Sequence, residues 1–115
     1  MIALPHVLDQ VATGIFQLAL LHTEDGLRFH LQDMRSGQDA RLSPEGAQTL
    51  AGILALHPFP LSIVALGDRA YARSSAIEVQ VLQDGLSVSI PAPCVHPVRH
   101  LLEELERTRS LFDAL

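Results

Sequence analysis

Two Asp-Gly dipeptides, each followed by a stretch of alternating apolar and polar residues, constrain the fold of this chain more than any other feature. Asp25-Gly26 precedes L-R-F-H-L, and Asp84-Gly85 precedes L-S-V-S-I. Alternation with a period of two is typical of a strand that buries one face, and Asp-Gly favours the tight turn of a β-hairpin. The chain is therefore predicted to contain two hairpins, one around each dipeptide.

A two-residue turn at each dipeptide also predicts which residues pair. In the first hairpin it places Leu20 opposite Leu31, and in the second it places Val81 opposite Val88. Each hairpin then presents one apolar face to a common core. The expected faces are formed by Leu18, Leu20, Phe29 and Leu31 in the first hairpin and by Val79, Val81, Val88 and Ile90 in the second.

Capping residues and helical spacing predict three helices. Ser43 is a favourable N-cap and Pro44 suits the first helical position, so one helix is expected over residues 44–56. Apolar residues that recur every three or four positions predict a short helix over residues 7–15. The same spacing predicts a last helix that begins at His96-Pro97.

The remaining segments predict further strands. Residues 61–66, L-S-I-V-A-L, form a short apolar run that is typical of a buried strand. Gly67-Asp68 is expected to turn this strand into another over residues 69–73. Residues 34–41 are polar and predict a loop with a short strand at its end.

The two hairpins show an internal similarity. Moving the chain by 59 residues along itself places Asp25 on Asp84, and each copy is then a hairpin followed by a helix that starts with proline. Two interpretations stay open: an internal ββα duplication, or chance, because Asp-Gly hairpins are common. The same alignment places His22 on Val81, so His22 is expected in the core or beside a small pocket.

Both interpretations lead to the same fold class. We expect an α+β protein, a two-layer sandwich in which an antiparallel sheet of hairpins is covered on one face by two or three helices. A length of 115 residues predicts a single domain over residues 1–115. The apolar fraction of 48% is high enough for folding and excludes a disordered chain.

Composition narrows the classes of function. All eight cationic residues are arginine and thirteen are carboxylates, and this net charge of -5 excludes a general basic surface for nucleic acid. No apolar stretch approaches the roughly 20 residues of a membrane-spanning helix, so no membrane partner is expected. The N-terminal residues show no secretory signal and Cys94 is the single cysteine, which together favour a cytoplasmic location.

One arrangement of side chains suggests a face that binds single-stranded nucleic acid. Arg69, Tyr71 and Arg73 alternate along an expected strand and therefore leave it on the same side. Arg28 and His30 alternate in the same way in the first hairpin. Cations beside an aromatic ring can hold phosphates and stack a base. The other interpretation, an ordinary solvent-facing surface, is favoured by the single tyrosine and the absence of tryptophan.

Candidates for metal binding or catalysis are few. Cys94, His96 and His100 form C-x-H-x-x-x-H, but a structural zinc site usually needs four ligands. The alternative places His96 at the helix cap and His100 on the helix surface. Glycine-rich phosphate loops, G-x-S-x-G and H-E-x-x-H are all absent from the sequence, so neither an enzyme nor a cofactor is expected. A thiol enzyme with Cys94 as nucleophile is the remote alternative.

The last helix is the expected docking surface. Its apolar residues are more numerous than one core-facing stripe requires, which suggests a strip left for a partner or for a second copy. The residues expected to bind this partner are Leu101, Leu105, Leu111, Phe112 and Leu115. We therefore expect a non-enzymatic protein-interaction module, adaptor or chaperone-like, that forms a homodimer through apolar helix surface.

The expected order of elements is helix, hairpin, helix, strands and helix in a small acidic chain. This order is loosely similar to that of class I type III secretion chaperones. The resemblance implies a dimer that binds effector proteins. The strand R-A-Y-A-R departs from the order of that family.

Overall fold

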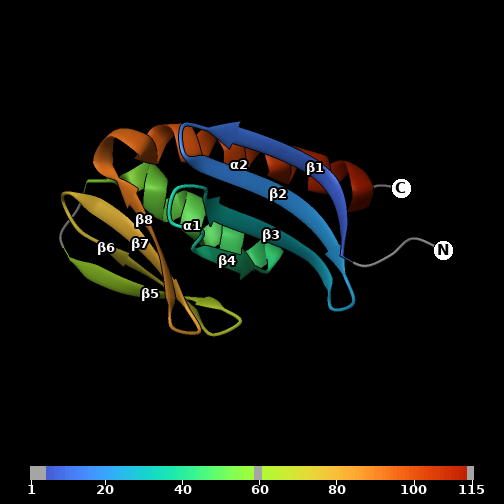
Figure 1. The fold of residues 1–115 in the computed structure, drawn as a ribbon, viewed down its shortest axis with the longest axis horizontal. Helices are drawn as coiled ribbons and strands as arrows, with labels where there is room; N and C mark the ends of the chain where they lie inside the picture. The colour runs from blue at the N-terminus through green and yellow to red at the C-terminus, as the bar shows by residue number, and fades with distance from the viewer. Residues whose placement is uncertain (1–4, 59–60, 114–115) are drawn as a thin grey trace.

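The computed structural model describes residues 5–58 and 61–113, and it is an α+β protein (Figure 1). The expected fold class is confirmed. The elements in chain order are β1 (His6–Thr13), β2 (Phe16–Thr23), β3 (Gly26–Asp33), β4 (Asp39–Leu42), α1 (Pro44–Leu56), β5 (Ser62–Gly67), β6 (Ala70–Ser74), β7 (Glu78–Gln83), β8 (Leu86–Pro91) and α2 (Ala92–Asp113).

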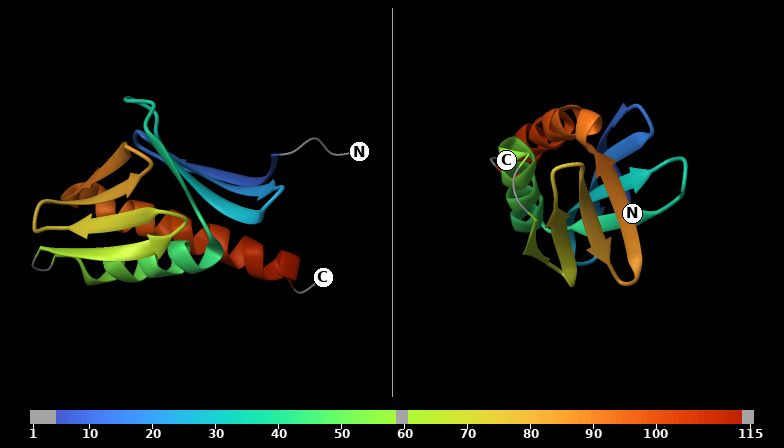
Figure 2. Two further views of the ribbon diagram at one scale, coloured as in Figure 1. Left: turned by 90° about the horizontal axis from the view of Figure 1, so that it is seen from below. Right: turned by 90° about the vertical axis from the view of Figure 1, so that its left-hand side faces the viewer.

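The strands form two antiparallel sheets, where the sequence had predicted one. Their orders are β1-β2-β3-β4 and β5-β6-β7-β8. Figure 2 shows both sheets on one side of the molecule and both helices on the other. α1 packs against β5, and α2 packs against β7, β8 and β1, so the helix pair underlies both sheets. One apolar core, to which both sheets and both helices contribute, fills the space between the layers.

The helix predicted over residues 7–15 is wrong, because this segment forms the edge strand β1. Its pairing with β2 shifts register between Val7 and Asp9, which marks a β-bulge. A bulge adds one residue and breaks the alternation of a strand. Leu8 and Val11 consequently both pack against the core at a spacing of three residues, which imitates the period of a helix.

The first hairpin has the predicted face but a different register. Leu20 pairs with Phe29, two residues away from the predicted partner, because the turn is Glu24-Asp25. Gly26 lies after the turn with a φ of +103°, and the Thr23 hydroxyl donates to its carbonyl oxygen at 2.8 Å. A shift of two residues leaves every side chain on its original face, so the predicted buried face is confirmed.

The second hairpin is confirmed in register as well as in face. Val81 pairs with Val88, and Asp84-Gly85 form the turn. The φ angles of Asp84 and Gly85 are +51° and +82°, as a type I′ turn requires. In this hairpin Asp-Gly itself forms the two-residue turn, so counting outward from the dipeptide gives the correct residue pairs.

The helix over residues 44–56 is confirmed. The hydroxyl of Ser43 accepts a hydrogen bond from the backbone N–H of Gly46 at 3.1 Å, and Pro44 is the first helical residue. The last helix begins earlier than predicted, at Ala92, so Pro97 lies inside it. Proline lacks the N–H that a helix interior uses, which is why the sequence indicated a later start.

The two sheets meet at β4 and β8, and glutamine side chains bridge the junction. The carboxamide of Gln83 accepts from the N–H of Arg41 at 2.8 Å and donates to its carbonyl oxygen at 2.7 Å. In the other direction, the N–H of Ser87 donates to Oε1 of Gln38 at 3.1 Å. These glutamine side chains thus form hydrogen bonds with edge backbone groups that would otherwise need a neighbouring strand as their partner.

Each half of the chain is a four-stranded meander followed by a helix. The 59-residue alignment equates β2 and β3 with β7 and β8, whereas the order within the sheets equates β2 and β3 with β6 and β7. These correspondences differ by one strand, and the internal duplication stays a prediction. The chain portion described also opens with a strand, so the helix-first order on which the chaperone resemblance rests is not observed.

Candidate interaction surface

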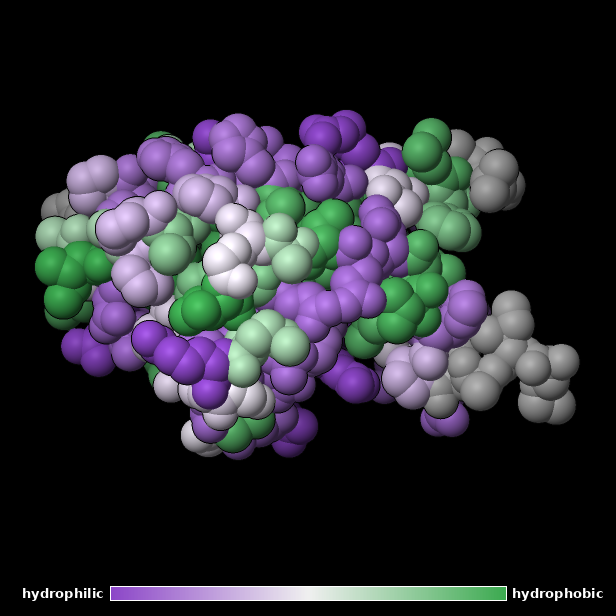
Figure 3. Space-filling model, turned by 45° about the horizontal axis from the view of Figure 1, so that its top comes forward, coloured by the Kyte–Doolittle hydropathy of each residue, from purple (hydrophilic) through white to green (hydrophobic). Residues whose placement is uncertain are grey.

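The residues predicted to form a docking strip on α2 differ in whether they are buried or exposed. Leu105 is fully buried in the core, and Leu101 packs against that core. Leu111 and Phe112 are exposed near the end of α2, and Figure 3 shows apolar atoms at that end of the molecule. Leu115 lies outside the described residues. The strip is therefore reduced to the last turn of the helix.

The outer side of α2 carries many charged residues. These are Arg99, Glu103, Glu104, Glu106, Arg107, Arg109 and Asp113. Arg99 pairs with Glu103 one turn along the helix at 3.3 Å. Arg109 pairs with both Glu106 and Asp113. A helix with this many charges on its outer side needs no partner to cover it.

Glu106 joins α2 to α1. Its carboxylate accepts a hydrogen bond from Nε of Arg109 at 2.9 Å and another from the Gln48 side chain on α1 at 3.0 Å. The hydrogen bond from Arg109 is the largest influence on the pKa of Glu106 and lowers it, while burial acts in the opposite direction. The carboxylate is thus held in its charged form.

α1 differs from α2 in having almost no charge. Glu45 is the one charged residue among its thirteen. The exposed positions after the first turn are Gln48, Thr49, Gly52, Ala55 and Leu56. Because a solvent-facing helix normally carries charged residues on its outer side, this surface is typical of a helix that a partner covers.

β5 is an edge strand with no charged residue. Its sequence is S-I-V-A-L-G, and β6 is its one strand neighbour within the described sheet. Val64 and Leu66 face the core, whereas Ile63 and Ala65 are exposed on the other face. Residues 61–66 were predicted to be a buried strand, and the structure buries one side of this apolar run only.

β1, the edge strand of the first sheet, is protected from pairing with another chain. β1 carries a bulge, and its Asp9 points toward α2, where the Thr108 hydroxyl donates to it at 2.8 Å. Bulges and inward-pointing charges are devices that stop an edge strand from pairing with another chain. β4 and β8 face each other at the sheet junction. β5 has a bulge beside its turn, after Ala65, and the strand before it is regular and uncharged.

Four large aliphatic side chains are exposed at the end of the second sheet where β5 starts, and Ile77 among them lies beside Ala92, after β8. The exposed fractions are 72% for Leu56, 63% for Leu61, 68% for Ile63 and 74% for Ile77. A hydrogen bond of 3.0 Å between the His57 ring and the Ser75 carbonyl oxygen joins the end of α1 to the loop after β6, so these segments are neighbours. We call the surface formed by these four residues, β5 and the adjacent side of α1 the β5–α1 flank.

Helical geometry places α1 on this flank. A Cβ added to Gly46 would lie 2.2 Å from the Leu66 carbonyl oxygen, so the first turn of α1 lies directly against β5. Ile53 follows Gly46 at helical spacing and is buried on the same side, whereas Thr49 and Leu56, near that side, are exposed. The sequence does contain a signal for this surface, namely a helix and a following strand that together hold one charged residue.

The arginine and tyrosine residues predicted to bind nucleic acid do not form one platform. Tyr71 and Arg73 are exposed on β6, while Arg69 lies in the preceding turn. Arg28 and His30 lie on β3, in the other sheet. Aspartates pair with two of these arginines, Arg28 with Asp68 at 3.6 Å and Arg69 with Asp84 at 3.3 Å, and the His30 ring forms a hydrogen bond of 2.7 Å with Asp39.

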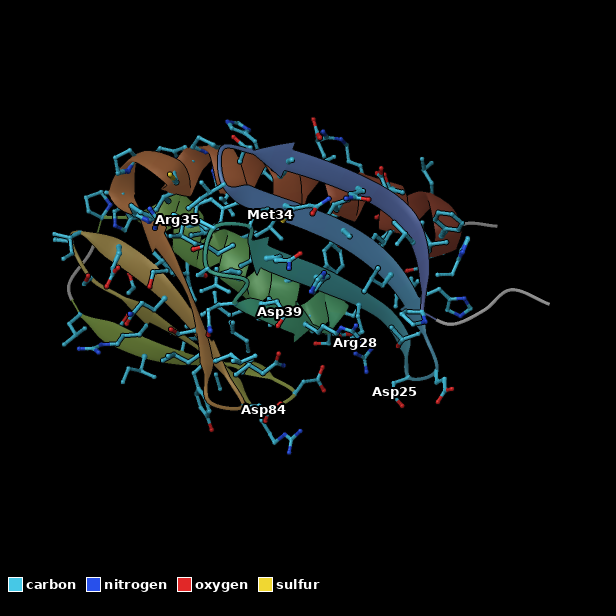
Figure 4. All side chains as sticks on the ribbon, viewed as in Figure 1. Asp25, Arg28, Met34, Arg35, Asp39 and Asp84 are labelled. Carbon is cyan, nitrogen blue, oxygen red and sulfur yellow. The ribbon has the colours of Figure 1, made fainter. Side chains whose placement is uncertain are left out.

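A hollow of about 510 Å³ lies between the tip of the β2–β3 hairpin and the two turns of the second sheet. Figure 4 shows Asp25, Arg28, Asp39 and Asp84 around it. Arg41, Arg69 and Asp68 complete its charged lining. Three arginines against four aspartates leave little net charge, so the hollow favours neither an anion nor a cation.

The structure does not assemble a metal or thiol site from the predicted residues. Cys94 is partly buried at the start of α2, and His96 and His100 are exposed. Within residues 5–58 and 61–113, no three side chains of ligating type converge. The prediction that His22 lies in the core or a pocket is wrong. It does lie on the same side of β2 as Leu20, but it is exposed close to the turn of the hairpin.

No helix in the part of the chain that the structure describes has the length and hydropathy needed to cross a bilayer. Comparisons with protein-family models, with curated proteins and with solved structures find no match to this chain. The function proposed below therefore rests on the surfaces of the molecule itself.

Proposed function

We propose that this protein is a non-enzymatic protein-interaction module that self-associates as a homodimer through the β5–α1 flank. The observation that carries the proposal is the set of four aliphatic side chains, each more than 60% exposed, at the end of the second sheet where the uncharged strand β5 starts. Exposed apolar patches mark interaction sites in soluble proteins. The single cysteine, Cys94, supports a cytoplasmic location as part of the proposal.

The magnitudes favour a reversible dimer. Complete burial of a large aliphatic side chain contributes about 1.5 to 3 kcal/mol. Covering the exposed parts of these four residues would contribute roughly 4 to 8 kcal/mol per copy, and twice that in a symmetric pair. Association itself costs on the order of 4 to 15 kcal/mol. Because gain and cost are similar, we expect a dimer whose population depends on protein concentration.

Charge limits where a second copy can dock. Each copy has a net charge of -5, so two copies repel each other over most of their surface and can approach only where few charged residues lie. A basic partner would be attracted to the acidic surface elsewhere. A twofold contact between identical flanks also limits the assembly to a dimer, because neither copy retains a free flank that could bind a third copy.

Sedimentation velocity at increasing protein concentration tests the proposal. Ile63→Lys should raise the dimer Kd at least about tenfold, because it places a charge from each copy in the apolar contact. Leu111→Lys is the matched control, since Leu111 is 69% exposed on the last turn of α2. A wild-type protein that stays monomeric, or a dimer that dissociates in Leu111→Lys and not in Ile63→Lys, overturns the proposal.

A further inference from the structure

We infer that the pocket between α1 and α2 is a binding site for a small, neutral apolar molecule about as large as benzene. The two helices pack against each other, and a pocket of about 140 Å³ lies between them above β3. This inference goes beyond the proposed function, because none of the four aliphatic side chains of the β5–α1 flank lines the pocket.

Short side chains on α1 leave this space open. Ala47 and Ala51 lie one turn apart on α1, Leu102 lines the pocket from α2, and Phe29 lines it from β3. Phe29, Ala47 and Leu102 are each at most 3% exposed, whereas Ala51 is half-buried and lies at the open side. Protein interiors hold few voids larger than a water molecule, so a gap of this size between two packed helices is a place that a ligand can fill.

The polar side chains at the rim of the pocket already have partners. Gln48 donates to Glu106 at 3.0 Å, and Glu106 also accepts from Arg109 at 2.9 Å. Glu103 accepts from Arg99 at 3.3 Å. The walls of the pocket are consequently mostly hydrocarbon, including the stems of these rim side chains. A polar group buried without a hydrogen-bond partner is costly, so the pocket favours an apolar ligand.

The volume of the pocket sets the size of the ligand. A cavity of about 150 Å³ with aliphatic and aromatic walls holds benzene or xenon, whereas sites for drug-sized ligands and cofactors measure about 300 to 1,000 Å³. A pocket of about 140 Å³ therefore fits a single ring and is too small for a nucleotide. The carboxylates of Glu103 and Glu106 at the rim also disfavour an anionic ligand.

Methyl NMR spectra of the full chain, recorded during a titration with benzene, test the site. The methyl signals of Ala47, Ala51 and Leu102 should shift and reach saturation, because the ring current of a bound benzene acts on neighbouring methyl groups. The methyl signals of Ile63, which is exposed on the β5–α1 flank, should not saturate. Absence of saturation at the three pocket residues overturns the inference.

Variants of α1 locate the bound benzene. Ala51→Leu fills the pocket and should raise the Kd for benzene at least about tenfold. Ala55→Leu is the matched control, because it makes the same change one turn further along α1, at an exposed residue that does not line the pocket. It should leave the Kd within about twofold of the wild-type value. Ala51→Val, a smaller change at the same position, repeats the test if the leucine variant does not fold.

Benzoate tests the chemical class of the ligand. It has the ring of benzene and a carboxylate, and it should bind at least about tenfold more weakly than benzene because the carboxylates of Glu103 and Glu106 lie at the rim. Equal Kd values for benzene and benzoate, or for Ala51→Leu and Ala55→Leu, overturn the inference. These measurements do not depend on whether the protein is a monomer or a dimer, so their failure leaves the proposed homodimer intact.

Discussion

Gln83 on β7 holds the main chain of Arg41 on β4 with both ends of its carboxamide. Its Oε1 accepts from the Arg41 N–H, and its Nε2 donates to the Arg41 carbonyl oxygen and, at 3.1 Å, to that of Asp68. One side chain thereby satisfies an edge of the first sheet and a turn of the second. The junction between the sheets depends on an amide, which can donate and accept at once.

Gln83→Glu should destabilise the fold. A carboxylate keeps the acceptor for the Arg41 N–H but cannot donate to the two carbonyl oxygens, which then face a negative charge. We expect a loss of about 1 to 2 kcal/mol in the free energy of unfolding, measured by urea denaturation. Gln80→Glu, on the outer face of the same strand, is the control and should change stability by less than about 0.5 kcal/mol. Equal effects of the two changes would contradict the role assigned to Gln83.

Gly46 and Gly52 on α1 should respond to alanine in opposite directions. A Cβ at Gly46 would lie 2.2 Å from the Leu66 carbonyl oxygen, whereas a Cβ at Gly52 would have nothing within 4 Å. Gly46→Ala should cost about 1 to 3 kcal/mol through the displacement of β5. Gly52→Ala should gain up to about 1 kcal/mol from helix propensity. Thermal unfolding of the two variants measures both signs, and stabilisation by Gly46→Ala would show that α1 does not lie against β5.

The pair between Glu106 and Arg109 should contribute to stability at neutral pH. The pKa of Glu106 is lower in the folded protein, chiefly through the hydrogen bond from Arg109, so the unfolded chain takes up this proton first. The contribution is complete above the ordinary pKa of glutamate and is lost as pH falls through the lowered value. Glu106→Gln should therefore reduce stability at pH 7 by less than about 1 kcal/mol and weaken its decline in acid. Glu104→Gln, exposed on the same helix, is the control and should change stability at pH 7 by less than about 0.5 kcal/mol.

A single-stranded oligonucleotide should not bind. Arg28 and Arg69 are each paired with an aspartate, which leaves Tyr71 and Arg73 as the exposed remainder of the predicted face on the second sheet. Fluorescence anisotropy of a labelled oligonucleotide at low salt should show no change on addition of protein. Steeply salt-dependent binding that Arg73→Ala removes, and that Arg107→Ala on α2 preserves, would instead support the nucleic-acid interpretation.

Local chemistry accounts for the parts of the fold that sequence analysis predicted. The turn at Asp84-Gly85 and the cap at Ser43 depend on residues close together in the chain, and both were found where expected. The first hairpin was predicted with the correct face and the wrong pairs. Asp-Gly is compatible with more than one turn, and here Thr23 stabilises the turn one residue earlier.

The errors arose where a distant contact decided the outcome. β1 was predicted to be a helix because its bulge spaces Leu8 and Val11 like residues of a helix, and its pairing with β2 is what makes it a strand. The docking surface predicted on α2 is narrower than expected. Leu105 follows Val98 and Leu102 at helical spacing, and this spacing already indicated the buried side on which the structure places it.

By itself, the sequence determined that the chain folds into hairpins and amphipathic helices around one apolar core, because alternation, turn residues and caps act over a few neighbouring positions. Only the tertiary structure decided that the strands divide into two sheets, and which apolar residues stay outside. An edge is defined by the absence of a neighbouring strand, a long-range property that no local pattern contains. For that reason β5, which reads as a buried strand, buries one face and leaves Ile63 on the other face 68% exposed.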